Sequence, residues 1–356
     1  MKKTILITGA GGGGSNNLFR DIQLSKLNLN EYDFIGSNIS KDIIAKSEME
    51  KNFILPIATD PNYLIKLNQL IGQEGIDLIL PNNDREVSAV SKNRDNINCR
   101  VFLPEKSTIE ICQDKYLFYD ALKNKIPMAD SIALTSYDDI GKAMNTLGGN
   151  KFWVRPRAGA GSKGACWIIT EEQAINFIKL WEELRGFNVK DYTISKFLPG
   201  RDFCFQSVWK DGKLVVAKMC ERLSYFGGEN RLSGMSSTPA VAQTVYDIGV
   251  YDMLIKTVYS LTDQPHGNFN FDLKGDENGV MCVTECNVGR FCMITPIFDL
   301  SGKYSTVEYY IRSAFDEKLD ISEVIDFEEN VFMLRELDTL PTIIRKEEIE
   351  AKSQIL

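Results

Sequence analysis

The chain has 356 residues, of which 44% are hydrophobic and 25% charged, and it carries a net charge of −8 with a pI near 5.1. This composition predicts a globular protein with room for two or three cores, at about 150 residues per domain. The negative charge argues against a nucleic-acid-binding surface, no apolar run approaches the roughly 18 residues that span a bilayer, and a single histidine excludes a multi-histidine metal site.

The cysteines indicate the redox environment of the chain. There are eight, they contain no C-x-x-C pair, and most lie within apolar runs. This pattern fits buried reduced thiols better than a disulfide framework or a zinc site. A glycine cluster follows the basic start too soon for a signal peptide. We therefore expect a cytoplasmic protein that acts on small molecules, without nucleic-acid or membrane partners, and a homodimer stays open.

Residues 1–106 predict a Rossmann-like parallel sheet, because short β-rich runs at 3–8, 33–37 and 76–81 alternate with helical stretches near 15–27, 61–74 and 84–94. The first strand leads into Gly9-Ala-Gly-Gly-Gly-Gly14, which satisfies a dinucleotide-binding pattern. An NAD-dependent oxidoreductase is therefore one candidate function. That pattern needs an acidic residue at the tip of the second strand, which instead ends in Gly36-Ser37-Asn38. A tight turn with close strand–helix packing explains the glycines more simply.

The third strand ends in the polar run Pro81-Asn-Asn-Asp84-Arg-Glu86, at an edge where open α/β sheets bind ligands. Pro104-Glu-Lys-Ser107 then links into one predicted helix, Thr108 to Lys125. The following elements are predicted in chain order: a strand at 152–157, a glycine loop at 158–164, a strand at 165–169, a helix at 171–185, an antiparallel run at 203–220, a mobile Gly/Ser-rich segment at 226–237 and a helix at 249–261.

A hairpin at 267–287 carries the clearest chemical signal. Glu285 and Asn287 share one face of their strand, because residues two apart point the same way. If the turn has an even number of residues, Asp272 lies across from Val283 and joins that face. Three hard oxygen ligands would then converge, which suits Mg²⁺. The alternative is a solvated hairpin with a polar face, although an unpaired charge in an apolar run is costly.

Four features stand in one order along residues 1 to about 320: Lys115 in a helix, a basic strand that feeds a glycine loop, the run Pro199-Gly200-Arg-Asp202, and the Asp/Glu-x-Asn hairpin. Together they resemble the ATP-grasp superfamily, especially carboxylate–amine ligases like the large subunit of carbamoyl phosphate synthase. The resemblance implies a Rossmann-like domain at 1–106, an ATP-grasp domain at 107–325 with a mobile lid at about 130–195 and an antiparallel-sheet core, and a C-terminal extension at 326–356.

The resemblance also implies the residues of an ATP site. Lys115 and Arg155 would meet phosphates, the loop with Gly159, Gly161 and Gly164 would close over them, Lys196 and Leu198 would hold adenine through the backbone, and Asp202 would bind the ribose. The magnesium ligands would be Asp272, Glu285 and Asn287. Arg290, with Arg222 or Arg231, would hold an acyl phosphate, although Arg222 and Arg231 read equally well as solvated surface arginines.

The implied reaction uses ATP and Mg²⁺ to activate a small-molecule carboxylate as an acyl phosphate, which an amine then attacks, with release of ADP. Two departures from the family pattern would support an alternative, a nucleotide-binding protein without ligase activity, although the intact set of Asp272, Glu285 and Asn287 argues against it. Ser195 stands where the family usually has Glu, and Glu285-Cys-Asn-Val-Gly-Arg290 lacks a proline and carries an extra residue. The sequence selects neither the carboxylate nor the amine.

Overall fold

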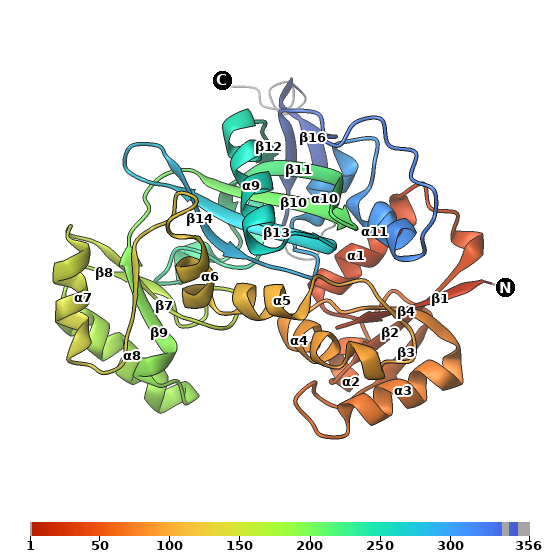
Figure 1. Cartoon of the computed structure of the whole chain (residues 1–356), viewed down its shortest axis with the longest axis horizontal. Coiled ribbons are helices and arrows are strands. Elements are labelled where there is room, and N and C mark those ends of the chain that lie inside the picture. Colours follow the sequence, from red (N-terminus) through yellow and green to blue (C-terminus); the bar gives the residue numbers. More distant parts are fainter. Residues whose placement is uncertain (1, 337–341, 348–356) are drawn as a thin grey trace.

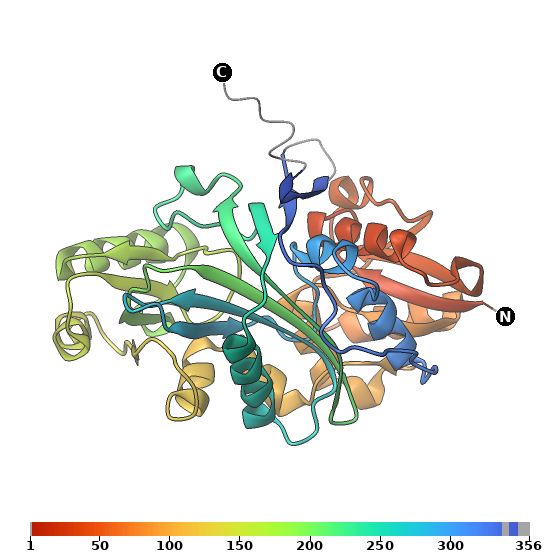
Figure 2. The ribbon, with the colours of Figure 1, turned by 90° about the horizontal axis from the view of Figure 1, so that it is seen from above.

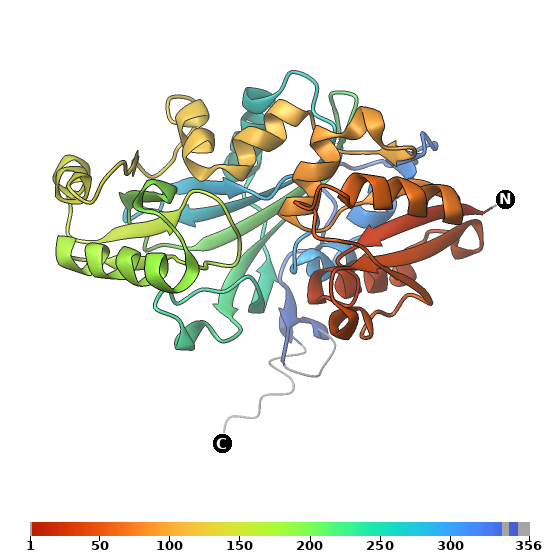
Figure 3. The same cartoon turned by 90° about the horizontal axis from the view of Figure 1, so that it is seen from below.

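The computed structural model describes residues 2–336 and 342–347, which build three β-sheets. Figure 1 shows an N-terminal sheet in red and orange, a lid sheet in yellow-green, and a central sheet in green to blue. The central sheet lies between the other two when the molecule is seen from above and from below (Figures 2 and 3). Within the described ranges, every helix is too short or too polar to cross a membrane.

The N-terminal sheet is parallel and has the strand order β3-β2-β1-β4-β5. Its strands are β1 (Lys3–Thr8), β2 (Tyr32–Asn38), β3 (Lys51–Ile54), β4 (Ile76–Leu80) and β5 (Arg100–Val101). Its helices are α1 (Gly13–Leu24), α2 (Lys41–Ile44), α3 (Tyr63–Glu74) and α4 (Asp84–Lys92). Because β1 and β4 are neighbours, the loops that follow them meet at one edge of the sheet.

The glycine cluster after β1 forms a tight turn. Gly9 and Gly11 have φ angles of 70° and 80°, where side chains are strained. A Cβ on Gly11 would also lie 1.9 Å from the carbonyl oxygen of Ile43. Close packing of the turn against the chain after β2 therefore requires glycine.

Two helices bridge the N-terminal sheet and the lid (Figures 1 and 3), where the sequence predicted one helix from Thr108 to Lys125. They are α5 (Lys106–Gln113) and α6 (Lys115–Leu122). That prediction was wrong at Asp114, whose carboxylate accepts hydrogen bonds from the backbone N–H groups of Tyr116 and Leu117 at 2.9 and 3.1 Å. Such a cap begins a new helix, and it places Lys115 in the first turn.

The lid sheet is antiparallel, in the order β6-β9-β7-β8. Its elements are β6 (Ser131–Ala133), α7 (Asp139–Leu147), β7 (Phe152–Pro156), β8 (Cys166–Ile168), α8 (Glu171–Arg185) and β9 (Tyr192–Lys196). The lid has a hydrophobic core of its own, which includes Phe152, Val154, Ile178 and Ile194. A unit with its own core can move as one body.

The central sheet is antiparallel, in the order β14-β13-β10-β11-β12-β15-β16. Its strands are β10 (Asp202–Lys210), β11 (Lys213–Tyr225), β12 (Pro239–Thr244), β13 (Gly267–Gly275), β14 (Met281–Cys286), β15 (Val331–Leu334) and β16 (Thr342–Arg345). Residues 331–334, expected in a C-terminal extension, thus extend this sheet. The remaining elements are α9 (Ile248–Leu261), α10 (Thr295–Leu300), α11 (Thr306–Ala314) and the 3₁₀ turns η1 (Leu29–Glu31), η2 (Arg94–Asn96), η3 (Val189–Asp191) and η4 (Gly228–Asn230).

The two faces of the central sheet differ in character. Phe203, Phe205 and Phe271 pack against the core residues of α9 on one face. The alternate residues point to the other face, which α10 and α11 cover around Gln206 and Val208. Beyond those helices the same face carries Asp202 and Asp272, which are therefore left facing a pocket.

The register of the β13–β14 hairpin differs from the prediction. Leu273 is opposite Val283 and Asp272 is opposite Glu285, with a β-bulge at Thr284 between the two pairs. The turn between Asp276 and Val280 holds three residues, an odd number. The bulge, rather than an even-length turn, therefore brings Asp272 and Glu285 to one face.

Candidate active site

The candidate site is a pocket of about 900 Å³ bordered by all three sheets. This volume is typical of small-molecule and cofactor sites. The lid contributes Trp153, Arg155 and residues 195–197, the central sheet contributes Asp202, Arg222, Asp272 and Glu285, and the N-terminal sheet contributes Asn82, Asn83 and Asp84.

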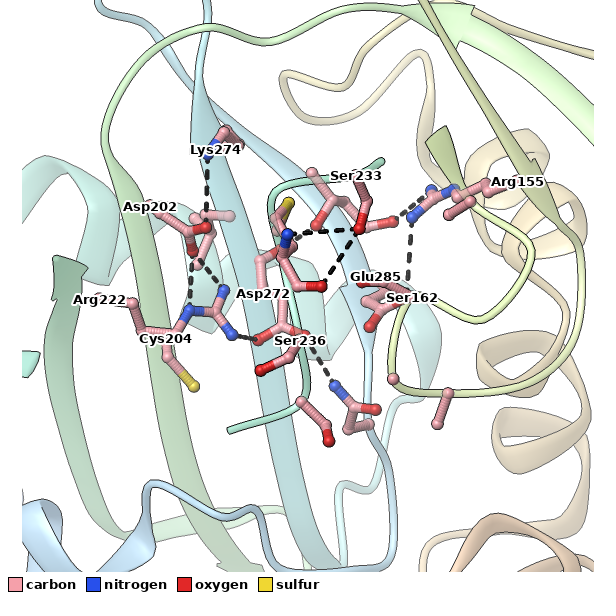
Figure 4. Close-up of a pocket in the computed structure, with 18 of the residues that line it drawn as sticks. Arg155, Ser162, Asp202, Cys204, Arg222, Ser233, Ser236, Asp272, Lys274 and Glu285 are labelled. Atoms are coloured by element: carbon pink, nitrogen blue, oxygen red, sulfur yellow. Dashed lines mark hydrogen bonds and ion pairs between the residues drawn. The ribbon is translucent and has the colours of Figure 1, made fainter. Parts of the chain in front are cut away.

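Three oxygen-bearing side chains meet on the pocket floor. Asp272 and Glu285 are cross-strand partners, and Asn287 Nδ2 donates to Asp272 Oδ2 at 2.9 Å. Figure 4 shows Asp272 and Glu285 on neighbouring strands beneath the serine-rich segment of Ser233 and Ser236. The structure thus brings together the residues predicted as magnesium ligands.

The surroundings of Asp272 and Glu285 shift the pKa values of these two carboxyl groups in opposite directions. Burial raises the pKa of Asp272 to about 6, with Arg222 opposing the shift and Glu285 adding to it. Burial alone would raise the pKa of Glu285 as well, but Lys115 and Arg155 lower it to about 2. Glu285 is therefore the ionised member of the pair, and Asp272 is the member that gains a proton below about pH 6.

Two cations converge on Glu285 from different elements. Lys115 Nζ lies 3.3 Å from Glu285 Oε2, and Arg155 Nη1 lies 3.7 Å from the same oxygen. Arg155 Nη2 also donates to the carbonyl oxygen of the bulge residue Thr284 at 2.9 Å. The bulge thus orients the arginine as well as the carboxylates.

The glycine loop of the lid accepts hydrogen bonds from two cationic side chains, Lys115 and Arg231. Lys115 Nζ donates to the carbonyl oxygen of Gly159 at 2.7 Å, and Arg231 Nη1 donates to that of Gly161 at 3.0 Å. Gly159, Gly161 and Gly164 have φ angles of 108°, 74° and 71°, which favour glycine. A Cβ on Gly164 would lie 3.0 Å from the ring of Pro156.

Lys196, Phe197 and Leu198 line the end of the pocket beneath the lid. The side chain of Lys196 is half exposed and pairs with Asp130 at 2.7 Å. Ser195 is 5% exposed and points to the pocket side of β9, because its neighbour Ile194 fills the lid core. Sequence reasoning missed Trp153, although it shares a strand face with Arg155 two residues later.

Arg222 does not point freely into the pocket. Its Nε donates to Asp202 Oδ1 at 2.8 Å and its Nη1 to Asp272 Oδ1 at 2.7 Å, and Figure 4 shows it between these two carboxylates. The other oxygen of Asp202 accepts from Tyr225 at 2.7 Å and lies 3.4 Å from Lys274. Arg222 is thus neither a solvated surface arginine nor free to bind an acyl phosphate, the two roles predicted for it. Asp202 could make its predicted ribose contact only by giving up one of its present partners.

Arg290 lies at the opposite end of the pocket from Lys196, against the N-terminal sheet. Its Nε donates to Asp84 Oδ1 and its Nη2 donates to Asn287 Oδ1. Burial would lower the pKa of Arg290, but Asp84 raises it above the usual range. The next residue, Phe291, donates its backbone N–H to Asn82 Oδ1 at 3.1 Å. Arg290 is therefore held in place beside Asn287.

No protein-family model matches the sequence, and no curated protein matches it. Solved structures do match. The biotin carboxylase domain of 2-oxoglutarate carboxylase from Hydrogenobacter thermophilus, in complex with MgADP, ADP and bicarbonate, has a TM-score of 0.73 at 15% identity over 94% of this chain and 74% of that one. N5-carboxyaminoimidazole synthetase from Staphylococcus aureus, complexed with ADP, has a TM-score of 0.73 at 17% identity over 95% and 83%.

L-amino acid ligase from Bacillus licheniformis has a TM-score of 0.67 at 13% identity over 93% of this chain and 79% of that one. The chain has the fold of the ATP-grasp superfamily. At such low identity the likeness concerns the ATP-grasp fold, and the chemistry has to be argued from the pocket of this chain.

The oxygen-bearing side chains on the floor of this pocket fit a hard divalent cation. Carboxylate and amide oxygens are the ligands that Mg²⁺ prefers, and it completes its shell with water and phosphate oxygens. Among residues 2–336 and 342–347, no group of three His, Cys, Asp or Glu side chains is placed to hold a metal. Two carboxylates and one amide would leave part of the coordination shell of Mg²⁺ to other oxygen ligands.

Proposed function

We propose that the protein is an ADP-forming ATP-grasp ligase that activates a small-molecule carboxylate as an acyl phosphate, which an amine then attacks. The observation that carries this proposal is the meeting of Asp272, Glu285 and Asn287 with two cations in one pocket. Phosphoryl transfer depends mainly on positioning and on stabilisation of developing charge. A pocket with paired carboxylates, one lysine and one arginine has the groups that this chemistry requires, without a histidine.

Asp272, Glu285 and Asn287 would hold Mg²⁺, which would neutralise charge on the β- and γ-phosphates of ATP. Lys115 and Arg155 now balance Glu285. Once a dication balances that carboxylate, both side chains can turn to phosphate oxygens. The guanidinium of Arg155 can contact two oxygens at once while its Nη2 stays anchored on Thr284.

The glycine loop would cover the phosphates and exclude water from the acyl phosphate. Its positive φ angles turn backbone N–H groups toward an anion without a Cβ in the way. Lys196 and Leu198 would hold adenine through their backbone groups, with Trp153 beside the base. Arg290 would hold the carboxylate and then the acyl phosphate, because it lies directly beside the metal ligand Asn287. Arg222 would act instead as a positioning residue for Asp272.

A screen for ADP release with hydroxylamine as the amine tests this function, because hydroxylamine traps any acyl phosphate as a hydroxamate. Glu285→Ala should abolish hydroxamate formation while circular dichroism stays normal. Glu277→Ala, in the exposed turn of the same hairpin, is the matched control and should retain full activity. Saturable ATP binding without ADP release for any carboxylate would favour the nucleotide-binding protein without ligase activity. Parent-like turnover by Glu285→Ala would refute the metal assignment.

A further inference from the structure

The pocket end formed by the N-terminal sheet presents two opposite charges side by side. Asp84 is the first residue of α4, and Asn83 caps that helix. Its carboxylate pairs with Arg290, which lies 206 positions later in the chain. Both side chains line the pocket, with 34% and 15% of their surfaces exposed. The fold thus holds a carboxylate and a guanidinium in direct contact at this end.

Each member of the pair keeps an atom available. Within residues 2–336 and 342–347, no hydrogen bond uses Asp84 Oδ2 or Arg290 Nη1. The neighbouring amides are already engaged. Asn82 donates to Ser15 Oγ at 3.2 Å and accepts from Phe291, and Asn83 pairs with Glu86 through both ends of its side chain. Asp84 and Arg290 therefore offer one negative acceptor and one positive donor next to each other.

Resting on the function proposed above, we propose that the activated carboxylate is that of an α-amino acid, with its carboxylate on Arg290 and its ammonium group on Asp84. A carboxylate alone would bring a second anion beside Asp84 and compete with it for Arg290. A zwitterion gives each of the two side chains a partner of opposite charge. With both partners in place, neither Asp84 nor the partly buried Arg290 is left with an unbalanced charge.

The contact between Asp84 and Arg290 also limits the spacing of the charges on the substrate. Because the two side chains are hydrogen-bonded to each other, an ammonium and a carboxylate that reach both must lie on the same or adjacent carbons. An α-amino group meets this condition. An amino group at the far end of a flexible chain would have to fold back, with a loss of conformational entropy.

The wall beside this pair indicates the side chain of the amino acid. Phe291, Cys292, Met293 and Ile294 follow Arg290 and line the pocket. The side chain of Met293 packs against the start of α1. A Cβ added to Gly13 would lie 3.2 Å from Met293 Cε, and one added to Gly14 would lie 3.8 Å from Met293 Sδ. An apolar wall gains from apolar contact and offers no partner to a polar group. The substrate side chain is therefore apolar.

The experiment compares matched carboxylates on the parent protein in the hydroxylamine assay. The pairs are alanine with propionate and leucine with isocaproate, and β-alanine and γ-aminobutyrate vary the charge spacing. We expect kcat/KM for the α-amino acids to exceed that for their des-amino partners by about tenfold or more, as one added ion contact provides. γ-Aminobutyrate should react no better than propionate. Equal rates for amino acids and des-amino acids would overturn the assignment.

Variants test the role of Asp84. Asp84→Asn should remove most of the preference, by lowering kcat/KM for the amino acids far more than for their des-amino partners. Arg85→Gln, at the exposed next position, is the control and should keep the parent preference. An Asp84→Asn variant that kept the preference would also overturn the assignment. ADP release with des-amino acids alone would contradict this inference but leave the ligase function standing, whereas no release with any carboxylate would remove the ligase function itself.

Discussion

Replacement of Arg222 by Met should destabilise the central sheet more than any surface charge removal. The Arg222 side chain is 12% exposed, and its partners Asp202 and Asp272 are 6% and 17% exposed, so all three charges are largely removed from water. Removal of one member of such a buried ion network typically costs about 3–5 kcal/mol, because the partners keep their charge without compensation. Tyr225, Lys274 and Asn287 still contact the two carboxylates. We therefore expect the lower end, about 3 kcal/mol.

The chain offers a control beside the same two strands. Arg201, directly before β10, pairs with Glu221 of β11 at 2.6 Å, with 59% of the Arg201 side chain and 12% of the Glu221 side chain exposed. Arg201→Met should cost about 1 kcal/mol, the upper end for surface pairs, because it leaves one carboxylate without its cation whereas Arg222→Met leaves two. Urea unfolding followed by tryptophan fluorescence measures both variants, since Trp209 is fully buried in β10.

Added Mg²⁺ should restore more stability to Arg222→Met than to the parent protein, because a dication supplies the positive charge that Asp272 has lost. The reasoning is refuted if Arg222→Met unfolds within about 1 kcal/mol of Arg201→Met. If Mg²⁺ raised the free energy of unfolding equally in both proteins, Arg222 would have no role at the metal site.

Three further predictions address the pH dependence, the hairpin turn and the lid loop. Because the pKa of Asp272 is raised to about 6, this carboxyl group stabilises the metal-free fold below its unfolded pKa and loses that contribution as the pH rises through 6. Mg²⁺ affinity should show the opposite trend, falling about tenfold per pH unit below 6 and levelling off above 7, and a flat calorimetric profile would contradict the assignment. Deletion of Asn278 should leave turnover nearly unchanged, because the pairs Asp276–Val280 and Asp272–Glu285 keep their register with a two-residue turn; lost turnover would show that the turn sets the register. Gly164→Ala should raise the KM for ATP about tenfold through strain in the lid loop. Gly148→Ala is the control and should leave the KM unchanged, because Gly148 has a similar φ of 65° but open space around an added Cβ. Equal KM values for the two variants would refute the strain argument.

The features that the sequence predicted are those set by short-range rules. Helix α8 spans the predicted residues 171–185, because a capping box at Thr170 and Gln173 begins it and Gly186 ends it. The grouping of Glu285 with Asn287 follows from the two-residue period of a strand. The tight turn at Gly11 follows from the freedom of glycine to adopt a positive φ.

The features that the sequence could not predict depend on contacts between distant segments. The bulge at Thr284 arises because the pairing of Asp272 with Glu285 does not continue the register set by the turn, and nothing local reveals this mismatch. Arg222 resembles any surface arginine until the fold places it between two carboxylates. The pairing of Asp84 with Arg290 likewise requires the N-terminal sheet and the central sheet to be in place. Helix α6 could have been found, because Asp before a helical run is a typical cap.

The hydrogen bond between Asn82 and Phe291 bears on how this protein could change in evolution. On the Phe291 side the hydrogen bond uses the main-chain N–H, so it does not depend on which side chain follows Arg290. Cys292 and Met293, which are only partly buried, can therefore exchange side chains while Arg290 stays in place beside Asn287, whereas Phe291 and Ile294 are buried in hydrophobic cores. Mutation of Cys292 and Met293 alone could admit new substrates. The residues proposed for phosphate transfer, including the neighbouring Arg290, would be inherited unchanged.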